Sequence, residues 1–447
     1  MPSQAAYAWS QAQWGEVELG DARRQKRAVA LGAALADASA GSLPQQVQGR
    51  AAAKAAYRLL DTEAVTHAAL TAPHRQATLQ AAQACGPAPV LFVQDGTALD
   101  FSHRTSLVGV GRVGNERGQG FCLHTCLALS AAEGTLLGLA DQRYWARPPA
   151  RPGESRTQRA RRHTEADVWA ECLETMGPAP LGATWVSVGD RGADVYGHLY
   201  QARTSGWHGL VRACQDRALA GGGYLLQQVR ALAPQAEQRV RVGSAPGEVC
   251  LLQVAWCPAQ LLPPKGPAGR GFPPTPLSVW VLRVWGPGLE WILVSTLPVE
   301  DAAAAAERVE WYSRRWTIED YHKGLKTGCR IEASQLRTAE RFGALLGFAA
   351  LVAVRLLQLR DRARQAPEGP VAESELSQKV LAARLKVPPA AVATNLGFWR
   401  GVAQLGGFLG RTGDGQPGWQ SLWRGWQQLQ LLLQGVELAQ NFLQKCG

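Results

Sequence analysis

The chain has 447 residues, of which 46% are hydrophobic and 19% charged, and its formal net charge is +11 at pH 7. This length and apolar content suffice for a large buried core and exclude a disordered chain. Nine cysteines without a CxxC spacing exclude the disulfide framework of a small secreted scaffold, so we expect a reduced, cytoplasmic protein.

We also expect no membrane-spanning segment. The longest uncharged apolar run, 342–354, has 13 residues, whereas a spanning helix needs about 20. The first twenty residues contain neither a basic segment nor an apolar run behind it, so we expect no secretion signal.

Residues 21–60 are predicted to form basic helices, interrupted at the sequence GSLPQ. Residues 22–60 carry seven basic side chains and one acidic side chain, Asp37. Such a patch suits a polyanion, most simply nucleic acid. The alternative is a solvated arginine-rich surface, and charge alone does not decide between the two. The candidate DNA contacts here are Arg23, Arg24, Arg27, Lys54 and Arg58.

From residue 89 the pattern changes to short apolar strands. LFVQD ends at Asp95, and WVSVGD ends at Asp190. Further strands are predicted over 121–130 and 135–139, and a helix over 165–176. Because ligands of α/β sheets bind at the carboxyl ends of strands, two aspartates on adjacent strands would face the same point.

Two segments interrupt this α/β pattern. Residues 147–163 carry six arginines against Glu154 and are predicted to form a mobile loop. Residues 205–300 mix strand-like runs with a stretch rich in Pro and Gly, which predicts an all-β insertion with one flexible loop.

After Asp301 the chain is predicted to be helical to about Arg364. Residues 311–341 again carry more basic than acidic side chains, seven against four. On one continuous helix, at about 100° per residue, four polar groups would share a stripe about 60° wide. They are Tyr312, Arg315, Glu319 and Lys326. Thr317-x-x-Asp320 resembles a capping box, which would instead start a new helix here.

A linker at 365–369 leads to a Leu-, Gln- and Trp-rich helical tail. Trp419, Trp423 and Trp426 have the spacing of one packing face. Two other patterns are expected to be structural only. The glycines Gly109, Gly111 and Gly114 match a dinucleotide fingerprint without its strand and helix, and Cys122, His124 and Cys126 lack a fourth metal ligand.

The carboxylates Asp95, Asp190 and Glu319 form the main functional hypothesis. Clustered carboxylates repel one another, and a pair of Mg²⁺ ions about 4 Å apart would neutralise them and promote in-line phosphoryl transfer. Arg and Lys on the helix of Glu319 would then hold phosphate oxygens. A single aspartate at a strand end is usually a turn or cap residue, so the hypothesis depends on the set.

Tyr-x2-Arg-x3-Glu-x6-Lys at 312–326, together with Asp95 and Asp190-Arg-Gly-Ala-Asp194, resembles the bacterial DDE transposases of the insertion-sequence-four family. The likeness covers nearly the whole chain and includes LGDARRQKR, RYWARP, EWILVSTLPVE and the tail around GWQSLWRGWQQLQ. Gly96, where relatives often have a hydroxyl residue, and residues 215–275 depart from the family pattern.

This resemblance implies an α/β fold: a ribonuclease-H-like catalytic core, interrupted by an all-β insertion at about 205–300 and flanked by helical regions. The implied domains are a DNA-end-binding region 1–70, a catalytic domain 71–365 and a dimerisation region 366–447. Asp95, Asp190 and Glu319 would bind two Mg²⁺, for which Mn²⁺ would substitute. Tyr312, Arg315, Lys326 and Arg212 would contact the transposon end, and Trp291 would stack on a flipped base.

The implied function is a cut-and-paste transposase that binds terminal inverted repeats, cleaves DNA through a hairpin intermediate and joins the ends to target DNA. Its partners would be double-stranded DNA and a second copy of the chain, at the bacterial nucleoid in the cytoplasm and without a membrane. Two alternatives stay open: a related nuclease or resolvase that cuts DNA without joining it, and a catalytically silent DNA-binding repressor.

Overall fold

The computed structural model describes residues 2–38, 41–114, 117–148, 153, 155, 164–242, 248–269, 271–364, 366–371 and 373–446. The chain divides into two compact units. Unit 1 is Met1–His74, Leu99–Val110 and Asp320–Gly447, and unit 2 is Arg75–Ala98 and Gly111–Glu319. The boundaries expected at 70/71 and 365/366 do not coincide with these divisions. Most of the arginine-rich loop expected at 147–163 lies outside the described residues.

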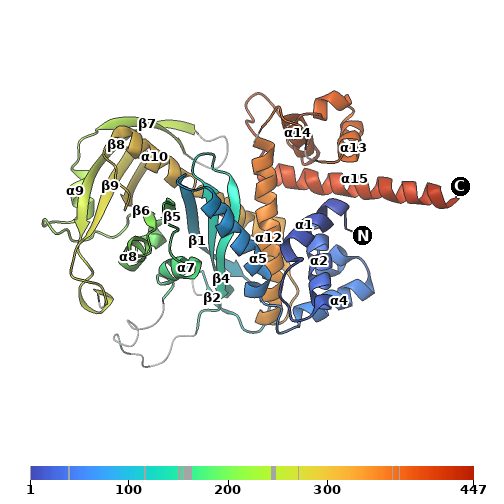
Figure 1. Ribbon diagram of the computed structural model, residues 1–447, viewed down its shortest axis with the longest axis horizontal. Helices are drawn as coiled ribbons and strands as arrows, with labels where there is room; N and C mark the ends of the chain where they lie inside the picture. Colours follow the sequence, from blue (N-terminus) through green and yellow to red (C-terminus); the bar gives the residue numbers. More distant parts are fainter. Residues whose placement is uncertain are drawn as a thin grey trace. The chain divides into compact units, whose positions relative to one another are not determined.

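A ten-stranded sheet forms the framework of unit 2 (Figure 1). Its strand order is β2-β3-β1-β5-β6-β10-β9-β8-β7, and β4 also pairs with β3. The strands are β1 (Val90–Asp100), β2 (Gly111–Val113), β3 (Gly118–Ser130), β4 (Leu136–Trp145), β5 (Trp185–Gly189), β6 (His208–Arg212), β7 (Ala236–Val242), β8 (Glu248–Leu261), β9 (Leu277–Gly286) and β10 (Leu289–Ser295).

The sheet has a parallel centre and antiparallel flanks. β5 is parallel to both β1 and β6, whereas β3–β4, β6–β10, β10–β9, β9–β8 and β8–β7 are antiparallel. All five residues of β5 are buried, as expected for a parallel strand covered on both faces. The central strands therefore provide a rigid, buried base, and Asp95 and Asp190 each follow two residues after the last paired residues of β1 and β5.

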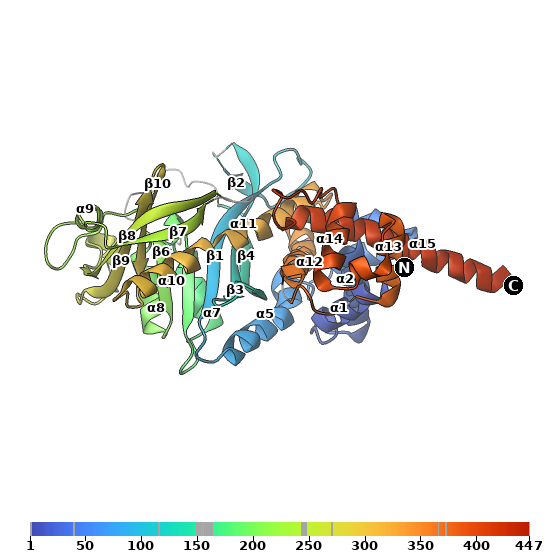
Figure 2. The same ribbon diagram turned by 90° about the horizontal axis from the view of Figure 1, so that it is seen from above.

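The segment 205–300 differs from the expected all-β insertion in two respects. It contains a helix, α9 (Leu225–Arg230). Its last strand, β10, pairs with β6, so β7–β10 extend the central sheet (Figure 2). The sequence pattern located β6, β8, β9 and β10 but not β7. Strand pairing across the insertion is a long-range property that a local pattern does not contain.

Helices pack on the sheet of unit 2. α7 (Val168–Met176) contacts α8 (Tyr196–Thr204) and β4, and α8 contacts β6. α10 (Ala302–Ser313) contacts β5, β6 and β7. Two further helices, α5 (His67–Ala84) and α11 (Trp316–Lys323), run across the division between the units.

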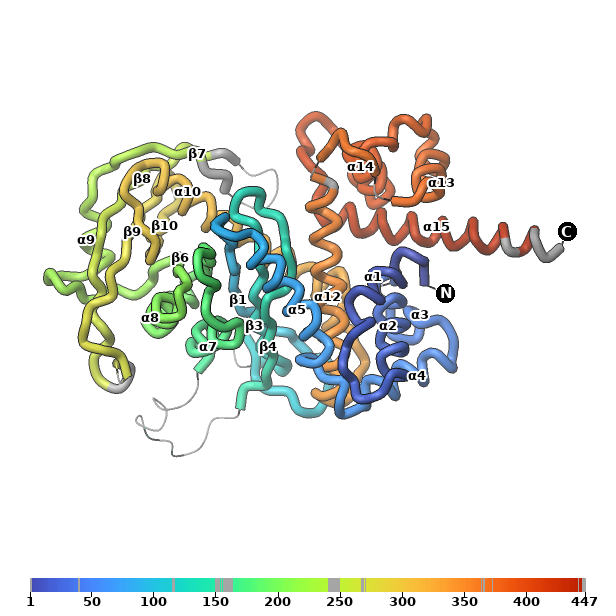
Figure 3. Tube along the Cα trace, viewed as in Figure 1, coloured from blue at the N-terminus to red at the C-terminus, as the bar shows by residue number. Residues whose placement is uncertain are grey.

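Unit 1 is helical and is built around α12 (Ala339–Arg364), which contacts α2, α4, α14 and α15. The path of its chain can be followed in Figure 3. Its other α-helices are α1 (Gln4–Trp14), α2 (Ala22–Asp37), α3 (Leu43–Val47), α4 (Arg50–Leu60), α13 (Glu375–Leu385), α14 (Asn395–Leu405) and α15 (Trp419–Cys446).

Trp14 anchors the first two helices in this unit. Its ring is fully buried against Phe348 of α12, and its Nε1 donates a hydrogen bond to the carbonyl of Leu70 at 3.0 Å. A Cβ at Gly32 would lie 2.1 Å from the Trp14 ring. Glycine at position 32 therefore allows α2 to approach this ring. Trp419, Trp423 and Trp426 are likewise buried, as their spacing predicted.

α12 is long and apolar enough, by length and composition, to cross a membrane. However, 89% of the corresponding window is buried within the protein, which is the environment of a core helix. The apolar run at 342–354 is therefore accounted for by packing in unit 1.

The segment expected to be helical from Asp301 to about Arg364 is not one continuous helix, and the alternative of a new helix near Thr317 is closer to the structure. α10 ends at Ser313, α11 begins at Trp316, and a π-helical turn, η3 (Gly324–Gly328), follows α11. A 3₁₀ turn at Ile331–Ala333 precedes α12. Because the helix is interrupted twice, the single stripe calculated for Tyr312, Arg315, Glu319 and Lys326 does not exist in that form.

Candidate active site

Asp95 and Asp190 occupy equivalent positions on neighbouring parallel strands. The paired register of β1 and β5 ends at Val93↔Val188, and each aspartate follows two residues later. β1 continues through Asp95 to Asp100, so Asp95 does not end its strand as the sequence suggested. The structure nevertheless brings both carboxylates to the same level of the sheet, where the negative charge of Asp190 contributes to the raised pKa of Asp95.

A chain of buried polar side chains fixes β1 against its neighbours directly beside Asp95. His124 Nε2 donates to Gln94 Oε1 at 2.9 Å, and Gln94 Nε2 donates to Ser187 Oγ at 2.9 Å. Ser187 Oγ then donates to His198 Nε2 at 3.0 Å, and His198 Nδ1 donates to the carbonyl of Ala193 at 3.1 Å. These roles are mutually consistent when both imidazoles are neutral, and burial lowers the pKa of His198 to about 4. We call these five residues the polar relay.

The polar relay also explains the Cys122, His124 and Cys126 pattern. His124 is buried, and its ring packs edge-on against Trp169 with 4.7 Å between centroids. The hydrogen bond to Gln94 uses its Nε2 atom. The contacts of His124 are therefore those of a packed structural residue, as expected.

Asp95 lies in an environment that disfavours its charge. Burial and, after it, the negative charge of Asp190 raise the pKa of Asp95 to about 6, although Arg315 acts in the opposite direction. The side chain is 18% exposed, and its Oδ1 accepts a hydrogen bond from the Gly96 N–H at 2.7 Å. A positive charge placed beside such a carboxyl group would stabilise its ionised form.

Arg315 links two of the three carboxylates. Its Nη1 lies 3.5 Å from Asp95 Oδ2, and its Nη2 donates to Glu319 Oε1 at 2.9 Å. Asp95, Asp190, Glu319 and Arg315 together carry a formal charge of −2. The Arg315 Nε is buried and has no hydrogen-bond partner among the described residues. Arg315 therefore neutralises part of the cluster while retaining an unused donor.

The structure places Tyr312, Trp291 and Arg212 near this cluster, but with limited access. Trp291 is 4% and Tyr312 is 3% exposed, and their rings meet edge-on with 5.2 Å between centroids. Arg212 Nη2 donates to the carbonyl of Glu290 at 2.9 Å. Stacking of Trp291 on a base, as the resemblance implies, thus requires the indole to leave this packed position.

The remaining predicted DNA contacts belong to unit 1. Arg27, Lys54 and Arg58 are exposed on α2 and α4. Arg24 is partly buried and donates to the Leu19 carbonyl at 3.0 Å, whereas the exposed Arg23 pairs with Asp21 at 3.2 Å. Lys326 lies in the π-helical turn of unit 1. Hydrogen bonds from Ser102 are the main cause that lowers the pKa of Asp100, and the positive charge of Lys326 adds to this effect.

Asp194 is a residue whose role the sequence did not reveal. Its carboxylate is fully buried and accepts hydrogen bonds from the N–H groups of Cys214 and Gln215, both at 2.7 Å. The Nε and Nη2 of Arg217 donate to its other oxygen at 3.1 and 2.7 Å. We call this arrangement the Asp194 clasp. It joins the turn after Asp190 to the segment after β6. The sequence motif Asp190-Arg-Gly-Ala-Asp194 draws attention to Asp194, but it does not predict the hydrogen-bond partners of this residue.

The carboxylates have the hard oxygen donors that Mg²⁺ and Mn²⁺ prefer. In the part of the chain that the structure describes, however, no three His, Cys, Asp or Glu side chains are gathered as a ready metal site. The oxygen atoms of these carboxylates therefore fit a divalent cation. In this structure, Arg315 lies between Asp95 and Glu319 and pairs with both.

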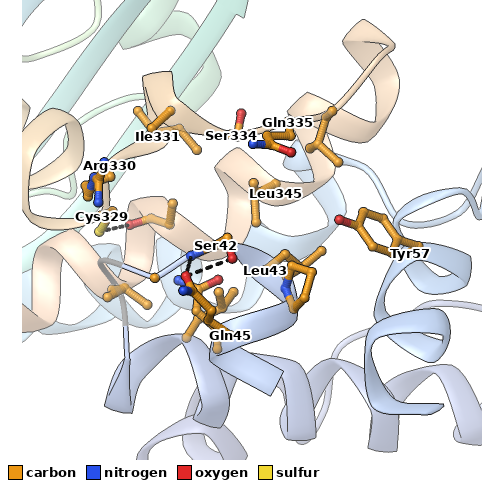
Figure 4. A pocket seen from close by; sticks show the side chains of 18 residues that line it. Ser42, Leu43, Gln45, Tyr57, Cys329, Arg330, Ile331, Ser334, Gln335 and Leu345 are labelled. Carbon is orange, nitrogen blue, oxygen red and sulfur yellow. Dashed lines mark hydrogen bonds between the residues drawn. The ribbon is translucent and has the colours of Figure 1, made fainter. Parts of the chain in front are cut away.

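Unit 1 contains a separate cavity of about 340 Å³ (Figure 4). It is lined by α2, α3, α4, the segment 329–336 and α12. Tyr57, Arg330, Ser334 and Gln335 contribute polar groups, but the described lining contains no Asp, Glu or His. This cavity therefore lacks carboxylate ligands among its lining residues, and it is not a competing candidate for the cleavage chemistry.

Three parts of the chain match known protein families. Residues 6–65 match the family described as Transposase DNA-binding, and residues 157–355 match Transposase DDE domain. Residues 375–446 match Transposase Tn5 dimerisation domain. The DDE match includes Asp190 and Glu319, whereas Asp95 precedes it.

The similar solved structures include one described as "Cryo-EM structure of piggyBac transposase synaptic complex with hairpin DNA (SNHP)". The sequence identity is 9% and the TM-score 0.31, over 78% of this chain and 54% of that chain. This chain thus spans about half the length of that protein, and a likeness at this level carries no argument about fold or function. The three family matches follow one another along the chain, and each is to a domain of a transposase.

Proposed function

We propose that this protein is a cut-and-paste DNA transposase of the insertion-sequence-four type. One observation carries the proposal: Asp95 and Asp190 stand at equivalent positions of adjacent parallel strands, and Arg315 connects Asp95 to Glu319. This is an acidic cluster at the carboxyl edge of parallel strands, where α/β folds bind substrates. It lies in a chain that also matches DNA-binding and dimerisation families.

The catalytic fold is proposed to be ribonuclease-H-like. The strand order β4-β3-β1-β5-β6, with antiparallel β3–β4 and parallel β1–β5–β6, supports this proposal. In this interpretation β7–β10 are the insertion that separates the two aspartates from Glu319. The proposed divisions remain 1–70 for DNA-end binding, 71–365 for catalysis and 366–447 for dimerisation.

Asp95, Asp190 and Glu319 would hold two Mg²⁺ ions, which Mn²⁺ would replace. When bound, such ions promote attack of water or a 3′-hydroxyl on a phosphodiester and neutralise the leaving oxygen. The chain's own contribution is positional. The β1–β5 register and the polar relay hold the two aspartates at one level, and Arg315 places a positive charge between Asp95 and Glu319.

DNA binding is proposed to use Tyr312, Arg315, Lys326, Arg212 and Trp291 near the cleaved end. The basic side chains Arg23, Arg24, Arg27, Lys54 and Arg58 would hold the adjoining duplex. Exposure of Arg27, Lys54 and Arg58 supports the second set, because phosphate contacts need accessible cations. The hairpin intermediate and the location at the nucleoid follow from the family resemblance alone.

A homodimer is proposed for the complex with DNA. Leu431, Leu438 and Phe442 on α15 are 67%, 70% and 68% exposed. Their spacing of seven and four residues places them on one helical stripe. An exposed apolar stripe of this kind is typical of an interaction surface, and it lies in the segment that matches a dimerisation family.

The test is strand transfer with purified protein in Mg²⁺. The substrate is a labelled duplex carrying the inverted repeat found beside the gene, mixed with a supercoiled target plasmid. We expect donor ends joined to the plasmid, and no cleavage by Asp95→Ala, Asp190→Ala or Glu319→Ala. Cleavage without joining would identify a nuclease or resolvase, and specific binding without cleavage a repressor; either result would reject the proposal.

A further inference from the structure

Unit 2 contains a second cavity, of about 240 Å³, beside the turn that follows Asp190. It is lined by Arg191, Arg212, Ala213, Cys214, Leu226, Arg230, Glu290 and Ile292. These residues come from the turn after β5, the end of β6, α9 and β10. Three of the eight are arginines. We call this cavity the arginine pocket.

The Asp194 clasp builds one wall of the arginine pocket. It ties the turn that carries Arg191 to the backbone of Cys214 through the 2.7 Å hydrogen bond from the Cys214 N–H. Cys214 Sγ adds a contact of 3.3 Å with the carbonyl of Arg191. The relative placement of Arg191 and Arg212 therefore depends on a buried, fully paired carboxylate and not on two flexible loops.

The arginines of the pocket differ in whether they have a partner. Arg230 pairs with Glu290 at 2.9 Å, and Arg283 pairs with the other oxygen of Glu290 at 2.9 Å. These partners lower the pKa of Glu290, which keeps it ionised at neutral pH. The exposed Arg191 guanidinium has no ion-pair or hydrogen-bond partner among the described residues. The lining thus carries a formal charge of +2.

We propose that the arginine pocket binds a phosphodiester group of the DNA strand that passes Asp190, with Arg191 and Arg230 as its ligands. This inference rests on the proposed DNA-cleaving function and adds a contact beyond the residues assigned above. Arg191 directly follows Asp190, so a phosphate held here is a near neighbour of the cleaved one. The forked guanidinium matches phosphate oxygens in geometry as well as charge.

The lining favours a phosphate over a base. No aromatic ring is among the described lining residues, so a base would have no flat surface on which to stack. Glu290 makes the site adjustable. It holds Arg230 through Nε and Nη2, at 3.1 and 2.9 Å, and these donors can be shared with an incoming phosphate.

The experiment measures binding of the wild-type protein to the inverted-repeat duplex in EDTA, so that cleavage does not contribute. Fluorescence anisotropy over a salt series gives the slope of log K against log salt. We expect Arg191→Ala to reduce this slope by about 1, the loss of one phosphate contact. Arg191→Lys should restore the slope but not the full affinity. Glu290→Gln should bind more tightly than the wild type.

The matched control is Arg203→Ala, an exposed arginine of α8 outside the pocket lining, and we expect it to behave as wild type.

A methylphosphonate scan identifies the contact directly. Replacing one linkage of the duplex by a neutral methylphosphonate should weaken wild-type binding at one position and leave Arg191→Ala unaffected there. Thermal melting of each variant verifies its folding. If Arg191→Ala retains the wild-type slope while the wild type binds the duplex, the pocket is not a phosphate site. If the wild type itself does not bind the duplex, the proposed function fails instead.

Discussion

Asp190 and Asp194 lie at the two ends of the same short turn, η1 (Arg191–Ala193), yet their surroundings differ in kind. Asp194 is fully buried and accepts four hydrogen bonds, two from backbone N–H groups and two from Arg217. Asp190 is partly exposed and accepts one, from the Gly192 N–H at 2.7 Å, in the part of the chain that the structure describes.

This difference separates a carboxylate that holds the fold together from one available for chemistry. A buried charge must be fully paired, because leaving it unpaired costs several kcal/mol. An aspartate with unused lone pairs beside another carboxylate can accept a cation or a substrate group. The two residues can therefore be distinguished by opposite responses to substitution.

The largest expected effect is on catalysis by Asp190→Asn. Cleavage of the inverted-repeat duplex in Mg²⁺ should fall by about a thousandfold, because several kcal/mol of transition-state stabilisation are lost. The free energy of unfolding should change little, because asparagine also caps a helical turn. Single-turnover cleavage and denaturant unfolding measure the two quantities. If the Asp190→Asn protein cleaved at the wild-type rate, Asp190 would not be needed for cleavage, and the proposed difference between Asp190 and Asp194 would be wrong.

Asp194→Ala should have the opposite profile. It leaves Arg217, 11% exposed, without its partner, and we expect the free energy of unfolding to fall by about 3–5 kcal/mol. The double variant Asp194→Ala/Arg217→Met should recover part of this loss because no unpaired charge remains. Urea unfolding measures both. A loss below about 1 kcal/mol for Asp194→Ala would mean that the clasp does not stabilise the fold.

Asp95→Asn should stabilise the protein in EDTA at pH 8. The folded protein binds the Asp95 proton up to about pH 6, whereas the unfolded chain loses it near 3.8. Folding therefore becomes less favourable as pH rises from about 4 to 6, and the penalty is complete above this range. The gain from Asn should be on the order of 3 kcal/mol at pH 8 and disappear near pH 4. Unfolding curves at both pH values test this, and an equal effect at the two would contradict it.

The smallest expected effect comes from Arg217→Lys. Lysine keeps the charge beside Asp194 but cannot donate through two nitrogens in a fixed fork. We expect a loss of about 1 kcal/mol in the free energy of unfolding, with DNA cleavage retained. Arg203→Lys on α8 is the control. If Arg217→Lys were as damaging as Asp194→Ala, the geometry of the fork, rather than charge pairing, would dominate the clasp.

Local sequence patterns predicted the elements that carry Asp95 and Asp190 because each follows a run of buried residues. Their alignment is seen in the structure, while their catalytic roles remain predictions. The capping-box pattern Thr317-x-x-Asp320 left open a new helix around Glu319, and α11 does begin close to it, at Trp316. Neither Gly nor Pro occurs between Tyr312 and Glu319 to signal that α10 ends at Ser313.

The contacts that sequence could not reveal are those between distant segments. Asp194 meets Arg217 across 23 positions, and Arg230 meets Glu290 across 60. Both pairs depend on how β6, α9 and β10 associate, and no local periodicity contains that association. Burial of Trp291 against Tyr312 is of the same type: an aromatic predicted as a DNA contact is also part of the packed interior.

The polar relay also acts as a check on assembly. A slip of β1 by one residue would turn Gln94 to the opposite face of the sheet and leave His124 and Ser187 buried without their partner. Such a misaligned chain loses several hydrogen bonds at once, because members of a buried network depend on one another. The relay thus favours the one register of β1 that places Asp95 level with Asp190.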